Sequence, residues 1–485
     1  MSQAVIQAQF VIGGEAAPSI TGEETKVKNP STGEITGTVS KGNREDVKRA
    51  IDAAEQGFKV WSRTAPAQRG EILWKGAKAI EQNLEELASS LTREQGKPLK
   101  ESRMEIRRFQ QTLEYYAGLG KNLRSVQIPM GENRFGMVLK RPIGICGSII
   151  PWNFPISLMG NKLAPGLLAG NAMVVKPAST TPLTAVRVVS LLCGAGLPAG
   201  TLNLVAGPGS SVGQELIENP KVAKIGFTGA TSTGIHVMKA AADTLKRVTL
   251  ELGGSDPLIV CDDANLDEAV SAASVGRFFN CGQACLAVKR LYVFDSIYDT
   301  FVPRLVEKVK KLTVGDGFSR AMLGPLHTDD QRKEVEGQVA DAVGRGAKIL
   351  VGGKRPEGKE YEKGNFLLPT LLENVPYDAQ LAKDECFGPA LPIFRVKNIE
   401  EAVERANDSI YGLGSSIYTS DLYKAHYAAE NLQAGYTWVN SGQIMFDELP
   451  FGGWKQSGLG QEHGWEALEH YTLSKSVVIA TRPGS

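Results

Sequence analysis

The stretch IGICGSIIPWNFP, residues 143–155, decides the fold of this chain. Its first eight residues form a short apolar run typical of a buried strand, and a loop with two prolines follows. Helical segments separate it from four further apolar runs, whose starts lie 23 to 30 residues apart: Met173–Val175, Leu202–Val205, Ile225–Phe227 and Val248–Leu250. Strands that alternate with helices in this way predict βαβ units and a parallel, doubly wound α/β sheet.

Helices are predicted before this sheet, and a second α/β unit after it. Asn43, with Asp46 at the third helical position, predicts the start of the first helix. Apolar spacing predicts a second helix over about Ile72–Leu91, which Gly96-Lys-Pro98 ends. The other expected elements are helices over about Ser102–Ala117, Tyr298–Leu312 and Ile399–Asn407, an extended segment over Ser125–Arg141, and a strand-like alternation near Ala347–Gly352.

Composition and charge are those of an ordinary soluble enzyme-sized protein of 485 residues, long enough for two or three domains. The net charge of +1, without a basic block, predicts no nucleic-acid partner. No apolar run reaches the roughly 18–20 residues that span a bilayer, and the N-terminus lacks the features of a secretory signal. Six cysteines are too few for a disulfide scaffold, so we expect a reducing, cytoplasmic location.

Ligands bind such sheets at the carboxyl ends of the strands, so the residues that follow each run are candidates. The first strand is followed by Trp152 and Asn153, in a rigid loop that either aims them at a ligand or serves as a turn with an aromatic plug. The second is followed by Lys176 and Ser179, where NAD-selective folds often carry an acid. A lysine there is either solvated or pairs with a 2′-phosphate, which would make NADP acceptable.

The fourth strand is followed by Gly229-Ala-Thr-Ser-Thr-Gly234, which has the glycine spacing of a P-loop. Ile235 and His236 stand where that loop needs a lysine and a hydroxyl, so a kinase or ATPase is excluded. The turn can still offer backbone N–H groups to a pyrophosphate. Glu251, after the fifth strand, supplies a carboxylate at the same edge of the sheet.

Two cysteines, Cys281 and Cys285, lie four residues apart within FFNCGQACLAVKR, residues 278–290. A zinc site needs about four ligands, no histidine is near, and a disulfide at this spacing would be strained, so we expect no metal and no disulfide. Buried packing is the commonest role of a lone cysteine. Gly282 and Gln283 predict a turn that leaves the Cys285 thiol near a helix start, where a thiolate is favoured. A nucleophilic Cys285 is therefore the favoured interpretation.

Seven motifs together carry a family resemblance, and they occur in this order: IIPWNFP, KPAS, GFTGATSTG, ELGG, FFNCGQAC, ECFGP and LPFGGWKQSG. With them the chain resembles the non-acylating NAD(P)-dependent aldehyde dehydrogenases, from about Val27 to Ala480. One such motif is a weak signal, but seven in order with family-like spacing are highly specific. The resemblance implies a Rossmann-type cofactor domain, a second α/β catalytic domain and small β-segments for oligomerisation. It places these in residues 1–123 with 143–254, in 255–453, and in 124–142 with 470–485.

The resemblance assigns roles residue by residue. Cys285 is the implied nucleophile, Glu251 the general base and Asn153 an oxyanion donor, while Lys162 and Glu462 match positions that relay protons. The implied cofactor contacts are Ile149, Trp152, Asn153, Lys176, Ser179, Gly209, Phe227, Gly229, Ala230, Leu252, Glu385 and Phe387. Ala230 replaces a common serine, so one pyrophosphate contact is expected to be lost. The implied substrate contacts are Phe154, Leu158, Asn161, Leu286, Ile444, Met445 and Phe451.

The implied reaction oxidises a small-molecule aldehyde to the free acid with NADP or NAD, through a cysteine hemithioacetal and thioester. Relatives that act on succinate semialdehyde carry arginines at positions matching Asn161 and Phe279, so an anionic substrate is disfavoured. Arg108, near the expected tunnel mouth, leaves open a semialdehyde or hydroxyaldehyde substrate. A cofactor-independent thiol esterase and a non-catalytic structural protein are the weaker alternatives. The resemblance also implies a homodimer or homotetramer.

Overall fold

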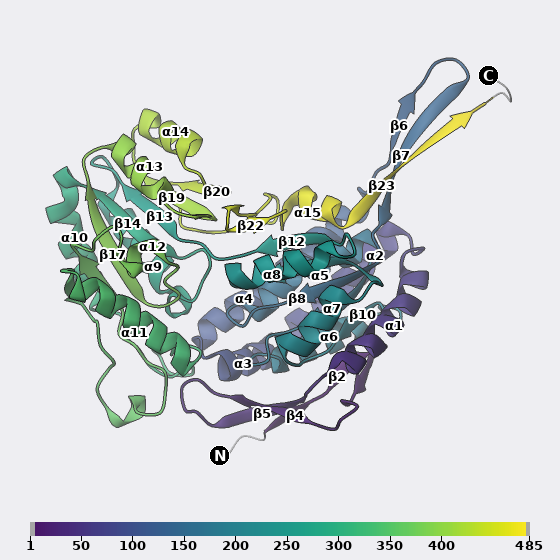
Figure 1. Cartoon of the computed structure of the whole chain (residues 1–485), viewed down its shortest axis with the longest axis horizontal. Coiled ribbons are helices and arrows are strands. Elements are labelled where there is room, and N and C mark those ends of the chain that lie inside the picture. Colours follow the sequence, from purple (N-terminus) through teal and green to yellow (C-terminus); the bar gives the residue numbers. More distant parts are fainter. Residues whose placement is uncertain (1–4, 482–485) are drawn as a thin grey trace.

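The computed structural model describes residues 5–481, which fold into two α/β bodies and a projecting arm (Figure 1). Residues 1–4 of the expected cofactor domain and residues 482–485 of the expected oligomerisation segment lie outside the described residues. Within the described range, no helix is long and apolar enough to span a membrane. Helices alternate with strands, and parallel strands lie at the centre of both large sheets, so the fold is α/β, as the sequence predicts.

The first body is built on an eight-stranded sheet of the described residues, in the order β22-β12-β11-β8-β9-β10-β2-β3. Its five central strands are parallel, and the two flanking strands β22 and β2 pair antiparallel. The bounds are β2 (Phe10–Ile12), β3 (Glu15–Ala17), β8 (Ile145–Ile149), β9 (Ala172–Lys176), β10 (Leu202–Leu204), β11 (Val222–Thr228), β12 (Arg247–Glu251) and β22 (Gly458–Leu459). The five predicted apolar runs are thus the five parallel strands.

Helices cover both faces of this sheet. Their bounds are α1 (Arg44–Trp61), α2 (Pro66–Gln82), α3 (Leu84–Gln95), α4 (Leu99–Leu119), α5 (Pro155–Ala169), α6 (Leu183–Gly194), α7 (Gln214–Glu218), α8 (Thr231–Ala242) and α15 (Gly464–His470). The Asn43 side chain caps α1 in the predicted capping box with Asp46. The prediction of a single helix over Ile72–Leu91 is wrong, because Asn83 separates α2 from α3. The Asn83 side-chain amide donates to the Ala79 carbonyl and so competes with the backbone hydrogen bonds that would continue the helix.

The second body contains a seven-stranded sheet of the described residues, in the order β15-β16-β17-β14-β13-β19-β20. Its strands are β13 (Asp256–Val260), β14 (Val288–Phe294), β15 (Lys348–Val351), β16 (Thr370–Glu373), β17 (Ala390–Val396), β19 (Gly414–Tyr418) and β20 (Tyr436–Val439). Its helices are α9 (Leu266–Phe278), α10 (Asp295–Val309), α11 (Asp329–Gly344), α12 (Gln380–Lys383), α13 (Ile399–Asn407) and α14 (Leu422–Asn431). Two separate apolar cores result, one in each body, and residues 467–471 return to the first.

A three-stranded arm extends from the first body, and Figure 1 shows it projecting away from both sheets. It consists of β6 (Val126–Pro129), β7 (Arg134–Pro142) and the C-terminal β23 (Thr472–Ala480), so the predicted extended segment is a hairpin. Small strands complete the fold: β1 (Ile6–Ala8), β4 (Glu24–Lys28) and β5 (Ile35–Ser40) form one sheet, and β18 (Tyr411–Gly412) pairs with β21 (Trp454–Lys455).

Candidate active site

The loop after β8 presents Trp152 and Asn153 toward the second body. The Trp152 ring stacks on His327 at 4.6 Å and meets the edge of Phe387 at 5.6 Å, which joins residues far apart in the chain. Asn153 is buried, and its amide donates to the Gln283 carbonyl at 3.1 Å. The two prolines therefore aim this loop at the turn before Cys285, and the tryptophan is more than a local plug.

The turn before Cys285 has an unusual backbone. Asn280, Cys281 and Gly282 have φ values of 48°, 55° and 73°, which is the left-handed region. A Cβ on Gly282 would lie 2.3 Å from the Gly388 carbonyl oxygen, so only glycine fits there. Three such residues in succession reverse the chain and bring Cys285 to the carboxyl edge of the first sheet.

Cys285 itself lies in a turn between a 3₁₀ segment (Phe279–Gly282) and β14, so the expected helix start is wrong. No helix dipole favours its thiolate. Burial raises the pKa of the Cys285 thiol to about 12, and the nearby Lys289 ammonium opposes that rise, whereas the Glu385 and Glu251 carboxyls add to it. Cys281 is fully buried, and burial raises its pKa too. The half-buried Cys285 is the accessible member of the pair.

Glu251 ends β12 as a buried carboxyl whose two oxygens have no hydrogen-bond partner among the described residues. Burial, and then the Glu462 carboxyl, raise its pKa well above the ordinary value, while Lys162 opposes the rise. Lys162 Nζ donates to Glu462 at 2.6 Å and to the Thr228 hydroxyl at 2.6 Å. A buried carboxyl without a partner is costly, so Glu251 does not stabilise the fold in its place, and its raised pKa makes it a candidate for a functional role.

A second buried lysine, Lys289, organises the other side of the thiol. It donates to the Glu385 carboxylate, to the Gly254 carbonyl at 2.8 Å and to the Cys285 carbonyl at 3.0 Å. Glu385 in turn accepts from the Gly254 N–H at 3.0 Å. Lys289 thus links the loop after β12, the thiol-bearing turn and Glu385 in one network.

The strand ends of the first body fit a dinucleotide. The Lys176 side chain is buried at the end of β9 and donates to no group in the described range, and burial lowers its pKa to about 8. The Ser179 hydroxyl donates to the Gly207 carbonyl at 2.9 Å instead of capping α6. The N-terminus of α8, after Gly229 and Ala230, has no side-chain cap, so its N–H groups are free for a pyrophosphate. Ile149, Gly209, Phe227 and Leu252 lie at the ends of neighbouring elements.

The expected substrate residues lie on both bodies. Phe154 stacks on Phe279 at 5.9 Å, and Phe451 lies 6.4 Å from the ring of Tyr436, which stacks on Trp438. Asn161 is not free, because its amide donates to Glu462 at 3.0 Å. The other expected residues are buried Leu158, half-buried Leu286 and Met445, and exposed Ile444. For all seven residues the substrate role stays a prediction.

Several residues of this site were not predicted from the sequence. Lys97, Asn280, His327 and Lys289 all contact the loops around the thiol. The available signal was a charged residue inside an otherwise buried run, as with Lys289 in VKRLYVF. Lys97 follows Gly96 in the expected helix stop, where its position carries no signal of a contact with Asn153.

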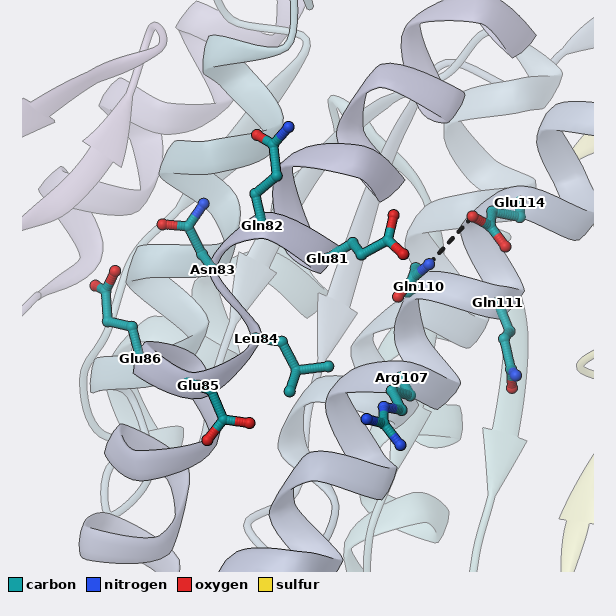
Figure 2. A pocket seen from close by; sticks show the side chains of 10 residues that line it. All are labelled: Glu81, Gln82, Asn83, Leu84, Glu85, Glu86, Arg107, Gln110, Gln111 and Glu114. Atoms are coloured by element: carbon teal, nitrogen blue, oxygen red, sulfur yellow. Dashed lines mark hydrogen bonds between the residues drawn. The ribbon is translucent and has the colours of Figure 1, made fainter.

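A separate surface hollow of about 600 Å³ lies over α3 and α4, away from these residues (Figure 2). Its carboxylates are already paired: Glu81 with Lys78, Glu85 with Arg103 and Glu86 with Arg187. It shares no residue with the site around Cys285, so the site is defined by the strand ends and not by this hollow.

Within the described residues, a thiol, an amide donor and a carboxyl without a hydrogen-bond partner lie at the ends of a doubly wound sheet that suits a dinucleotide, and this combination is typical of an oxidoreductase that handles carbonyl groups. Residues 18–477 match the model of the aldehyde dehydrogenase family. The chain is 41% identical over 476 residues to betaine aldehyde dehydrogenase of Bacillus subtilis (strain 168), covering 96% of each chain. It is 39% identical to the NADP(+) succinate-semialdehyde dehydrogenase of Escherichia coli (strain K12), covering 98% of each.

A solved structure agrees with these relatives. Betaine aldehyde dehydrogenase from Staphylococcus aureus in complex with NAD+ superimposes with a TM-score of 0.96 at 36% identity, covering 99% of this chain and 96% of that one. The chain therefore belongs to the aldehyde dehydrogenase family. It is an enzyme that oxidises an aldehyde with NAD or NADP.

Proposed function

We propose that Cys285 is the nucleophile of this oxidation. The observation that carries the proposal is the buried Glu251 carboxyl, which has no hydrogen-bond partner in the described part of the chain. It lies close enough to Cys285 for its charge to raise the pKa of the Cys285 thiol. A carboxyl of raised pKa is a stronger base than an ordinary carboxylate, so beside a thiol it is a group that can accept a proton. The thiolate adds to the aldehyde carbon and forms a hemithioacetal.

The oxygen of this adduct becomes negatively charged, and Asn153 is the proposed donor to it. One N–H of its amide is used by the Gln283 carbonyl, and the second remains available. Such a donor typically contributes about 3–4 kcal/mol to the transition state. The backbone N–H of Cys285 is the proposed second donor.

The residues proposed to hold the dinucleotide are Ile149, Trp152, Lys176, Ser179, Gly209, Phe227, Gly229, Ala230, Leu252, Glu385 and Phe387. The cofactor, when bound, accepts the hydride that leaves the adduct. Lys289 fixes Glu385 and Phe387: it pairs with the carboxylate and lies 5.5 Å from the Phe387 ring centroid. Lys176 supplies an unpaired positive charge for a 2′-phosphate, which supports NADP as well as NAD.

Glu251 is the proposed general base for the last step. It removes a proton from the water that hydrolyses the thioester, and Lys162 with Glu462 is proposed to pass the proton on. The product is the free carboxylic acid. This arrangement also disfavours a thiol esterase as the main activity, since the cofactor residues would then have no role.

The substrate proposed is an uncharged aldehyde. Arg108, the one cation expected at the mouth, donates to the Asp447 carboxylate at 2.9 Å, so its charge is neutralised. Asp447 also accepts from the Thr112 hydroxyl and contacts His463, which holds it in place. A semialdehyde remains the second candidate, because one named relative acts on succinate semialdehyde.

We further propose that residues 5–123 with 143–254 bind the cofactor, that 255–453 form the catalytic domain, and that the arm joins copies of the chain into a dimer or tetramer. The arm exposes Val126, Ile128 and Val478, and apolar strand edges are usually covered by a partner. All six cysteines are free, which suits the reducing cytoplasm.

Reduction of NAD and NADP should be followed by the absorbance of the NADH or NADPH that forms, with aliphatic, aromatic and anionic aldehydes in turn. The proposal expects aldehyde-dependent reduction and the acid as product. Hydrolysis of p-nitrophenyl acetate without any aldehyde-dependent reduction would support a thiol esterase, and no reaction with any aldehyde would contradict the proposal.

A further inference from the structure

Lys97 is a fully buried cation that contacts two consecutive residues of the active-site loop. Its Nζ donates to the Asn153 main-chain carbonyl at 2.6 Å and lies 3.8 Å from the centroid of the Phe154 ring. The same Nζ pairs with the Glu105 carboxylate at 2.6 Å. One ammonium therefore touches both the proposed oxyanion donor and the proposed wall of the substrate tunnel.

The carbonyl of Asn153 is held from a second direction. The Asn280 side-chain amide donates to it at 3.0 Å and to the Gln283 carbonyl at 3.2 Å. Because the Asn153 amide also donates to the Gln283 carbonyl, Asn153 is fixed at its main chain and at its side chain. This leaves the side chain one free N–H in a defined direction.

Helix α4 anchors both loops. Glu105 Oε1 accepts from the Ile156 N–H at 2.8 Å, while its other oxygen pairs with Lys97. Glu101, one turn earlier, accepts from the Asn280 N–H at 3.0 Å. The loop that carries Asn153 and the left-handed turn that precedes Cys285 are thus attached to one helix.

A buried ion pair rarely adds stability over well-packed apolar side chains, so stability alone does not explain a charge at this position. We propose that Lys97 is a positioning residue that sets the direction of the Asn153 amide and the place of the Phe154 ring together. The proposal rests on the function above, in which Asn153 binds the developing oxyanion. Lys97 itself touches neither substrate nor the reacting atoms.

The first test replaces the ammonium with an apolar chain of similar length, Lys97→Met. We expect kcat to fall about a hundredfold, as when catalytic groups are displaced by about 1 Å, and KM for the aldehyde to rise through Phe154. The dissociation constant for the cofactor should be unchanged. Lys246→Met is the matched control: Lys246 is also a buried lysine that donates to two main-chain carbonyls, those of Asn219 and Val222, outside the site.

The second test is a double-mutant cycle. If Lys97 acts through Asn153, Lys97→Met should lower kcat no further in an Asn153→Ala background, while its effect on KM persists. Independent, multiplicative losses of kcat would overturn the proposal. So would an equal fall in kcat for Lys246→Met, since that would show a loss of stability and not of positioning.

Two further measurements keep the proposal testable. If Lys97→Met fails to fold because Glu105 is left unpaired, Lys97→Met/Glu105→Gln removes that charge and should show the same kcat loss. Hydrolysis of p-nitrophenyl acetate, which acylates the thiol without a cofactor, provides the same cycle if the wild type oxidises no aldehyde. Failure of the oxidation would then count against the proposed function, and additive losses in ester hydrolysis against Lys97.

Discussion

Lys162 Nζ lies 2.6 Å from Glu462 Oε1, and both side chains are almost completely buried beside Glu251. Two buried carboxyls therefore lie near one buried ammonium, which hydrogen-bonds to Glu462 but, within the described residues, not to Glu251. Glu462 already forms an ion pair, so Glu251 bears the unfavourable part of this arrangement. Burial is the main cause of its raised pKa, and the rest depends on the balance between the Glu462 carboxyl, which adds to the rise, and the Lys162 ammonium, which opposes it.

That balance predicts opposite effects for two substitutions. Glu251 must lose its proton to act, so the water step should speed up as pH rises through its raised pKa. Glu462→Gln removes the neighbouring negative charge and should move the acid limb of the rate to lower pH. Lys162→Met removes the positive charge and should move it to higher pH. The measurement is the pH profile of thioester hydrolysis, taken as the steady rate that follows the initial burst of cofactor reduction. A shift of the acid limb in the same direction for both variants would contradict this account.

The two cysteines should respond differently to replacement. Cys285→Ala should abolish oxidation, because no other accessible thiol lies in the turn. Cys281→Ala should keep kcat and lose only about 1 kcal/mol of unfolding free energy, as is usual for one buried substitution. Turnover assays and thermal unfolding of both variants check this. Equal loss of activity in the two would indicate a paired-thiol site.

Cofactor choice should depend on the end of β9. Ser179→Glu places a carboxylate beside the 2′-phosphate position and should raise KM for NADP about ten- to a hundredfold more than KM for NAD. Because Lys176 has a pKa of about 8, KM for NADP should also rise above that pH, while KM for NAD changes little. Steady-state kinetics with both cofactors decide this, and a wild type that rejects NADP would refute it.

The arm should mediate association. Val478→Asp puts a charge on an exposed apolar position of β23 and should give a monomer, as measured by light scattering at micromolar concentration. Leu245→Asp is the control, since Leu245 is 90% exposed in a turn outside the arm. A wild-type monomer, or dissociation by both variants, would contradict an arm-mediated oligomer.

The preference for uncharged aldehydes should depend on Asp447. Asp447→Asn keeps the hydrogen-bonding shape but frees the charge of Arg108. We expect kcat/KM for succinate semialdehyde to rise up to about fivefold relative to butanal, since one exposed charge pair contributes up to about 1 kcal/mol. An unchanged ratio would mean that Arg108 does not face the substrate.

Most of the first body could be predicted from the sequence because its parallel strands are apolar runs and some of its helix ends carry clear local signals. Asn43 and Gly96 mark helix ends through local chemistry alone, and the structure has helix ends at both. The helix break at Asn83 was not predicted, because the apolar spacing continues through this residue. The signal is only the hydrogen bond from its side-chain amide to the Ala79 carbonyl.

The site was predicted unevenly for a physical reason. Residues at strand ends, such as Asn153 and Glu251, follow from the topology. Lys97 and Lys289 do not. Lys97 reaches Asn153 across 56 residues of sequence and Lys289 reaches Glu385 across 96, and no spacing rule connects residues so far apart. The helix start expected near Cys285 failed because left-handed residues, and not a helix, make the turn.

The return of the C-terminal segment to the first body has a consequence for biosynthesis. Glu462 and the strand β22, which pairs with β12 beside Glu251, come from the last stretch of the chain. Domains generally fold as they leave the ribosome, N-terminal parts first. A nascent chain that has exposed Cys285 and Glu251 therefore still lacks the carboxylate that pairs with Lys162. The ion pair between Lys162 and Glu462 can form only after residue 462 has been translated, and a product truncated after residue 453 would carry the thiol without it.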